Sequence, residues 1–137
     1  MERQGGCACG AVRYVAEGGP LRVGLCHCLT CRKRHGAPCN AFAAFRADKV
    51  RIAGRTSVWA SAEHGLLHGC AICGAPLFWT ADGDGEGDGE IEIHLGGLDL
   101  IGQFNPQYEV WVNRREPWMM PLNVPQYAEN RPVGMAS

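Results

Sequence analysis

The spacing of the cysteines constrains this chain more than any other feature. Of the eight cysteines in 137 residues, seven form close groups, namely Cys7 and Cys9, then Cys26, Cys28 and Cys31, then Cys70 and Cys73. Side chains two residues apart on an extended chain point to the same side, and a C-x-x-C turn also brings two thiols together. Two C-x-C pairs and two C-x-x-C spacings in so short a chain therefore predict metal sites built from cysteine.

Disulfides are the alternative use for so many cysteines. The N-terminus has no apolar run of signal-peptide length, and no stretch approaches the roughly 20 apolar residues of a membrane helix. We therefore expect a cytoplasmic protein, in which thiols stay reduced and clustered cysteines serve metal binding or catalysis. Pairing within each group would also close strained loops. Metal binding is the interpretation we carry forward.

The rest of the sequence predicts a mainly β fold, with one or two short helices, in a single domain over residues 1–137. The 19 glycines and 8 prolines suit turns between short strands better than a helical bundle. Strands are expected at residues 11–16, 21–25, 41–45, 49–53, 56–61, 76–80, 90–95 and 108–112. Gly54-Arg55 predicts a hairpin, and Thr30 to His35 a helical turn. From about residue 117 the proline-rich tail should be irregular and pack Trp118 and Tyr127 onto the body.

The acidic, glycine-rich segment after Ala81 begins like a calcium loop. Residues 82, 84 and 86 are acidic and Gly87 holds the sixth position, but the twelfth is Ile93, where a bidentate Glu is required. No helices are predicted on either side of it. We interpret this segment as a hairpin loop.

Seven clustered cysteines divide naturally into four plus three. Cys26, Cys28 and Cys31 are self-contained, which leaves Cys7, Cys9, Cys70 and Cys73 for a closed tetrahedral zinc site. A site with three protein ligands keeps a position open for a substrate. An alternative closes the second site with Cys39 or His27; we favour a small hydrophobic role for Cys39 and a place outside the ligand set for His27.

Three segments carry a family likeness: Gly6-Cys7-Ala8-Cys9-Gly10, Cys26-His27-Cys28-Leu29-Thr30-Cys31-Arg32-Lys33 and Cys70-Ala71-Ile72-Cys73-Gly74. With Gly36-Ala37-Pro38, Gly97-Leu98-Asp99 and Arg115-Glu116-Pro117-Trp118, the chain resembles the glutathione-dependent formaldehyde-activating enzyme family, which is similar to the centromere protein V domain. The resemblance implies a β-tent fold, a structural zinc on Cys7, Cys9, Cys70 and Cys73, and a catalytic zinc on Cys26, Cys28 and Cys31. It departs from the family at Glu109, where a histidine is usual, and at residues 66–69, where many members have an arginine.

The resemblance implies a carbon–sulfur lyase that forms S-hydroxymethylglutathione from glutathione and formaldehyde. Zinc bound by three thiolates prefers a fourth sulfur, so the substrate thiol would fit the open position. Arg32, Lys33 and Arg34 could attract the carboxylates of glutathione, or could form only a solvated basic face. A noncatalytic zinc module that binds glutathione or a protein is the alternative. A net charge of −1 without a basic stripe disfavours nucleic acid.

Overall fold

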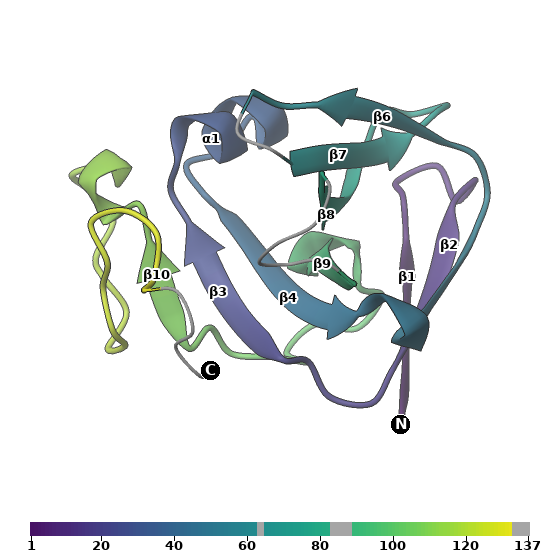
Figure 1. Ribbon diagram of the computed structural model, residues 1–137, viewed down its shortest axis with the longest axis horizontal. Helices are drawn as coiled ribbons and strands as arrows, with labels where there is room; N and C mark the ends of the chain where they lie inside the picture. The colour runs from purple at the N-terminus through teal and green to yellow at the C-terminus, as the bar shows by residue number, and fades with distance from the viewer. Residues whose placement is uncertain (63–64, 83–88, 133–137) are drawn as a thin grey trace.

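The fold is mainly β, as the sequence predicts. The computed structural model describes residues 1–62, 65–82 and 89–132 (Figure 1). Its strands are β1 (Glu2–Gly6), β2 (Arg13–Glu17), β3 (Arg22–Cys26), β4 (Asn40–Arg46), β5 (Val50–Ala53), β6 (Thr56–Ala60), β7 (Gly65–Cys70), β8 (Pro76–Ala81), β9 (Glu90–His94) and β10 (Tyr108–Val110). The helices are α1 (Leu29–His35) and the 3₁₀ turns η1 (Ala47–Lys49), η2 (Leu95–Gly97) and η3 (Val112–Arg114). None of these helices is long and apolar enough to cross a membrane.

The strands form two sheets of unequal size. The smaller sheet has the order β1-β2-β5, and the larger has the order β10-β3-β4-β9-β8-β7-β6. Neighbouring strands are antiparallel except β10, which lies parallel to β3 at one edge. Figure 1 shows the larger sheet curving from β10 at the left through β3 and β4, with β1 and β2 at the right. One face of the larger sheet therefore covers the small sheet, and its other face is available for a site.

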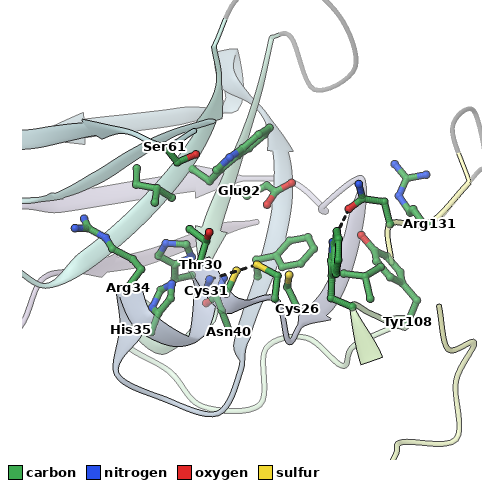
Figure 2. A pocket seen from close by; sticks show the side chains of 18 of the residues that line it. Cys26, Thr30, Cys31, Arg34, His35, Asn40, Ser61, Glu92, Tyr108 and Arg131 are labelled. Carbon is green, nitrogen blue, oxygen red and sulfur yellow. Dashed lines mark hydrogen bonds between the residues drawn. The ribbon is translucent and has the colours of Figure 1, made fainter. Parts of the chain in front are cut away.

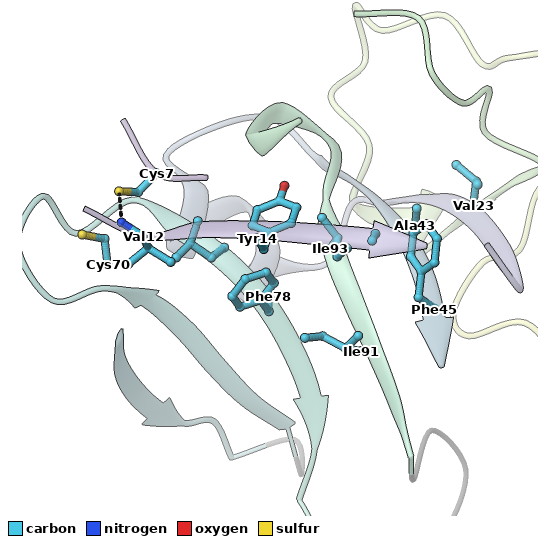
Figure 3. Packing of buried hydrophobic residues seen from close by; sticks show 12 residues of the cluster. Cys7, Val12, Tyr14, Val23, Ala43, Phe45, Cys70, Phe78, Ile91 and Ile93 are labelled. Atoms are coloured by element: carbon cyan, nitrogen blue, oxygen red, sulfur yellow. Dashed lines mark hydrogen bonds between the residues drawn. The ribbon is translucent and has the colours of Figure 1, made fainter. Parts of the chain in front are cut away.

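The main core lies between the two sheets. Its members include Val12, Tyr14, Ala16, Val23, Ala43, Phe45, Phe78, Ile91 and Ile93, several of which Figure 3 shows in contact. Alternate residues of a strand point to opposite faces, so Ala43 and Phe45 of β4 face this core while Phe42 faces away. Burying each large apolar side chain contributes about 1.5–3 kcal/mol to folding. This core fixes the register of β4 and β9, and hence the residues on their other face.

The predicted hairpin at Gly54-Arg55 is wrong. β5 pairs with β2 of the small sheet, whereas β6 pairs with β7 of the large one, so the chain crosses between sheets at Gly54. Gly54 has a φ of +108°, and a Cβ there would lie 2.3 Å from the carbonyl oxygen of Ala11. Glycine at this position therefore permits a close crossing of two backbones, which the sequence pattern alone cannot distinguish from a tight turn.

Two strands, β1 and β7, form where none is predicted. Their sequences, ERQGG and GLLHGC, carry few of the β-branched residues that mark strands, and both depend on pairing with neighbours. The predicted strand at 108–112 ends at Val110, because Trp111 takes up left-handed backbone angles with a φ of +56°. The acidic segment interpreted as a hairpin loop lies largely outside the described residues.

The tail packs differently from expectation. Tyr127 lies edge-on to Tyr108, with ring centroids 6.5 Å apart, as expected for a residue on the body. Trp118, however, is 68% exposed, so the expectation that it packs is wrong. The tail is held by backbone hydrogen bonds from residues 125–129 to β10 and the following turn, and these bonds leave Trp118 outside the contact.

Candidate functional site

Cys7, Cys9, Cys70 and Cys73 come together as one group of thiols. One sulfur from each lies within 4.8 Å of the others. The Sγ atoms of Cys7 and Cys9 are 3.6 Å apart, and those of Cys9 and Cys70 are 3.8 Å apart. Tetrahedral zinc with bonds of about 2.3 Å would hold its sulfurs about 3.8 Å from one another. The donor set therefore fits a closed tetrahedral metal site, and all four cysteines are free of disulfides.

Backbone N–H groups donate hydrogen bonds to the sulfurs of this four-cysteine group. Ile72 and Cys73 donate to the Sγ of Cys70 at 3.3 and 3.4 Å, and Val12 donates to the Sγ of Cys7 at 3.2 Å. The bond from Val12, with smaller effects from the other thiols, lowers the pKa of Cys7 to about 6 despite burial. Thiolates are the form that binds metal, so these bonds stabilise the binding state. The group links the β1–β2 turn to the β7–β8 turn.

Cys26, Cys28 and Cys31 form a second group, here called the cysteine trio. Their sulfurs also lie within 4.8 Å of one another, and within the described part of the chain the group includes no fourth His, Cys, Asp or Glu. Cys26 ends β3, Cys28 caps the N-terminus of α1, and Cys31 lies in its first turn. The Sγ of Cys28 accepts the Cys31 N–H at 3.3 Å. Three sulfurs at the junction of a strand and a helix fit a metal that keeps one position for another ligand.

Hydrogen bonds among the three thiols favour deprotonation of Cys28. Hydrogen bonds from the thiols of Cys26 and Cys31, supported by backbone N–H groups, hold the pKa of Cys28 far below its usual range. The same contacts, together with burial, raise the pKa of Cys26 and Cys31. These contacts favour a thiolate within the trio, which is the form of cysteine that binds metal.

Neither Cys39 nor His27 belongs to the ligand group. Cys39 is half-buried and lies outside the trio. His27 is fully buried between two of the trio's cysteines, and its Nε2 is 2.7 Å from Oε1 of Glu109, which lies on β10. The ring contacts the neighbouring strand and lies outside the trio, in line with the expectation that His27 points away from Cys26 and Cys28.

Glu109 is the centre of a buried network that sequence reasoning misses. Its Oε2 accepts hydrogen bonds from the Leu122 N–H and from the Gln126 side chain, each at 2.8 Å, and Arg115 lies 3.4 Å from Oε1. Burial raises the pKa of Glu109, but the bonds from Gln126, His27 and Leu122 outweigh it and lower that pKa to about 2. The one signal in the sequence is an acid between the apolar residues Tyr108 and Val110.

A cavity of about 740 Å³ opens beside the cysteine trio, on the face of the larger sheet opposite the core. The trio, Thr30 and Arg34 line one side, and Figure 2 shows Tyr108 and Arg131 on the opposite side. Glu92 and Phe42 belong to the sheet beneath. Trp111 lines the cavity, and its Nε1 donates to Asn130 at 2.9 Å. A ligand of peptide size could therefore contact the sulfurs, cations and aromatic rings together.

Of the three basic residues predicted to bind carboxylates, Arg34 lines both the cavity and a smaller neighbouring hollow, Lys33 lines only the hollow, and Arg32 lines neither. Trp59 also lines that hollow. Arg32 is paired with Glu116 at 2.6 Å and donates to the Pro38 carbonyl at 3.3 Å. All three also lie at the C-terminal end of α1, where positive charge stabilises the helix dipole, so their clustering in the sequence has a structural cause as well.

The fold and the site define a small mainly β protein with two cysteine groups suited to metal, one closed and one facing a cavity. The sequence profile described as glutathione-dependent formaldehyde-activating enzyme matches residues 2–114, and the chain belongs to this family. The match includes all seven clustered cysteines and ends before the tail that contacts Glu109. Family membership indicates a function related to glutathione and formaldehyde.

A solved structure supports the fold. A crystal structure of a Rhodobacter sphaeroides protein aligns with a TM-score of 0.57 and 23% sequence identity, covering 75% of this chain and 91% of that chain. At this identity the likeness concerns the fold alone. No curated protein sequence matches the chain.

Proposed function

We propose that the protein is a zinc-dependent carbon–sulfur lyase-like enzyme that forms S-hydroxymethylglutathione from glutathione and formaldehyde. The observation that carries this proposal is the cysteine trio, three sulfurs without a fourth protein ligand among the described residues, beside a cavity of about 740 Å³. The choice of glutathione as the thiol and formaldehyde as the aldehyde rests on family membership. In the reaction a bond forms between the glutathione sulfur and the aldehyde carbon, and the carbonyl oxygen gains the proton that the thiol loses.

The two cysteine groups would hold zinc for different purposes. Cys7, Cys9, Cys70 and Cys73 match a structural site, which would contribute directly to the stability of the fold. Cys26, Cys28 and Cys31 match an open site. When bound there, zinc supplies a soft Lewis-acid position that favours the deprotonated form of a thiol, whose pKa is otherwise about 8.5.

Residues around the cavity would bind and orient the thiol substrate. Arg34 is the cation closest in sequence to the trio that lines the cavity, and it is suited to a carboxylate of glutathione. Trp111 and Tyr108 provide aromatic walls that exclude water from the reacting atoms. The paired Arg32 would support α1 through Glu116, and Lys33 would contribute charge outside the cavity.

Magnetisation-exchange NMR on glutathione and formaldehyde tests this proposal against a reaction that also proceeds unaided. The zinc-loaded protein should increase the exchange rate between glutathione and its hydroxymethyl adduct several-fold. Cys28→Ala should abolish the increase, whereas Cys39→Ala, which removes a neighbouring thiol outside the trio, should retain it. Glutathione binding without any rate increase would instead identify a noncatalytic module, and an unaltered rate with Cys28→Ala would exclude the trio as the reaction site.

A further inference from the structure

Strand β9 presents two polar side chains to the cavity. Its alternate residues Ile91 and Ile93 are buried in the core between the sheets. Glu92 and His94 therefore project from the opposite face, and both line the cavity that contains the cysteine trio. Neither residue has a part in the function proposed above, so their chemistry requires a separate explanation.

The charge of Glu92 is incompletely balanced. Arg22, which is buried, lies 2.7 Å from Glu90 but 3.5 Å from Glu92, so one guanidinium serves two carboxylates and lies closer to the other one. Burial, with a smaller effect from Glu90, raises the pKa of Glu92 to about 7, although Arg22 and, more weakly, Arg131 act in the opposite direction. A carboxylate in such a position is stabilised by a cation that enters the cavity.

His94 provides an independent sign of a ligand. The residue is only 6% exposed, and neither of its ring nitrogens has a hydrogen-bond partner among the described residues. Its ring lies edge-on to His35, with centroids 4.4 Å apart. Burial, with smaller effects from His35 and Arg34, lowers the pKa of His94 to about 3, so the imidazole is neutral and keeps one accepting nitrogen. Buried polar groups in folded proteins are normally hydrogen-bonded, so this ring lacks a partner that a ligand can supply.

The sheet register places these residues at increasing distances from the trio. Cys26 pairs with Asn40, His94 with Phe42, and Glu92 with Ala44. Strand spacing and rise then put the Cα atoms of His94 and Glu92 about 12 and 17 Å from that of Cys26. In glutathione the thiol lies on the central residue, and the eight bonds from its sulfur to the amine of the γ-glutamyl group span about 10 Å when extended. The side chains of the trio and of β9 close the remainder. A glutathione-sized thiol bound at the trio can therefore reach His94 and Glu92 with its other end.

We propose that Glu92, assisted by His94, binds the ammonium group of an amino-acid-like thiol such as glutathione. The inference rests on the proposed function, because it takes the thiol end of the ligand to lie at the trio. A primary ammonium donates three hydrogen bonds, so it can satisfy the Glu92 carboxylate and a nitrogen of His94 at once. Figure 2 shows Glu92 between Arg34 and Arg131, a pattern of charge that suits a ligand with one amine and two carboxylates.

The test compares two thiols on the zinc-loaded protein by isothermal titration calorimetry. The ligands are glutathione and its deaminated analogue, in which a glutaryl group replaces the γ-glutamyl group and only the amine is missing. The wild-type protein should bind glutathione about tenfold more tightly, the size expected for one hydrogen bond between charged groups. Glu92→Gln should abolish this preference. Glu17→Gln, which removes the same charge from β2 in the other sheet, should keep it.

Each outcome bears on a different claim. Equal affinities for the two thiols in the wild-type protein would overturn the role of Glu92 while leaving the proposed reaction intact, and this comparison needs no variant to fold. A preference that survives in a folded Glu92→Gln protein would also overturn it. If neither thiol binds, although the protein contains its full complement of zinc, both the proposed function and this inference are refuted.

Discussion

Nε2 of His27 lies 2.7 Å from Oε1 of Glu109, and both side chains are buried. This pair connects the segment that carries the cysteine trio to the edge strand β10. Through Gln126 and the Leu122 N–H, the same carboxylate also fixes the C-terminal tail. Glu109, which stands where the family usually has a histidine, thus joins three segments of the chain. Its contribution can be measured as a free energy of unfolding.

Replacing Glu109 by Ala should destabilise the protein by about 2–4 kcal/mol, because the buried His27 would lose its partner and two partly buried donors of the tail would lose their acceptor. Urea denaturation followed by circular dichroism measures the change. Glu116→Ala, which breaks the partly exposed pair with Arg32, is the matched control and should cost at most about 1 kcal/mol. Similar losses for both variants would contradict a special role for the buried network.

Glu109 should also make stability depend on pH in the acid range. Its pKa is lowered to about 2 in the folded state, against about 4.3 when unfolded, so the unfolded chain binds the proton first as pH falls. The stabilisation is therefore complete above about pH 4.3 and decreases as the pH falls toward 2. Comparing the wild-type protein with Glu109→Gln between pH 2 and 5 isolates this effect, since other acid-sensitive groups are common to both. Parallel curves would exclude it.

Metal content should distinguish the two cysteine groups. The purified protein should bind two zinc ions per chain, measured by plasma mass spectrometry, because two groups of clustered thiols are available. Cys28→Ala should reduce this number to one, and Cys39→Ala should leave it at two. A mild chelator should remove the ion of the cysteine trio first, since three ligands hold a metal less tightly than four. A single ion that survives in Cys28→Ala and in the wild-type protein alike would refute the open site.

Cys73 offers a clean test of the structural site. Its side chain is exposed, so replacing it by Ser removes little packing, and any large loss of stability must come from lost metal binding. We expect the unfolding free energy to fall by more than about 3 kcal/mol. Ile72→Ala is the control, because Ile72 is the exposed neighbour within the same turn. Thermal unfolding of both variants, with and without added zinc, provides the comparison; equal melting temperatures would show that Cys73 holds no structural ion.

The sequence predicts the local features well because their causes are local. The cysteine trio and each half of the four-cysteine group depend on the geometry of a C-x-C or C-x-x-C segment, and most strands show their alternation directly. The joining of the two halves, Cys7 and Cys9 with Cys70 and Cys73, is long-range and is inferred by dividing the cysteines into four plus three. The features that the sequence does not predict depend on how distant strands pair. The partner of Glu109 is 82 residues away, and the cavity lining by Glu92 follows from how β9 pairs with β4 and β8. Gly54 misleads because a sheet-to-sheet crossing and a hairpin need the same residue.

Cys28 is both the N-cap residue of α1 and a member of the cysteine trio. The helix therefore cannot begin at another residue without displacing the sulfur of Cys28. A chemical modification of that sulfur would also change the capping of the helix. Alkylation of Cys28 would turn a thiolate acceptor of the Cys31 N–H into a weakly accepting thioether and loosen the first turn. Arg34, less than two turns further along, would lose its fixed position in the cavity. Reagents that attack this thiol should thus affect the recognition of a charged ligand as well as the binding of metal.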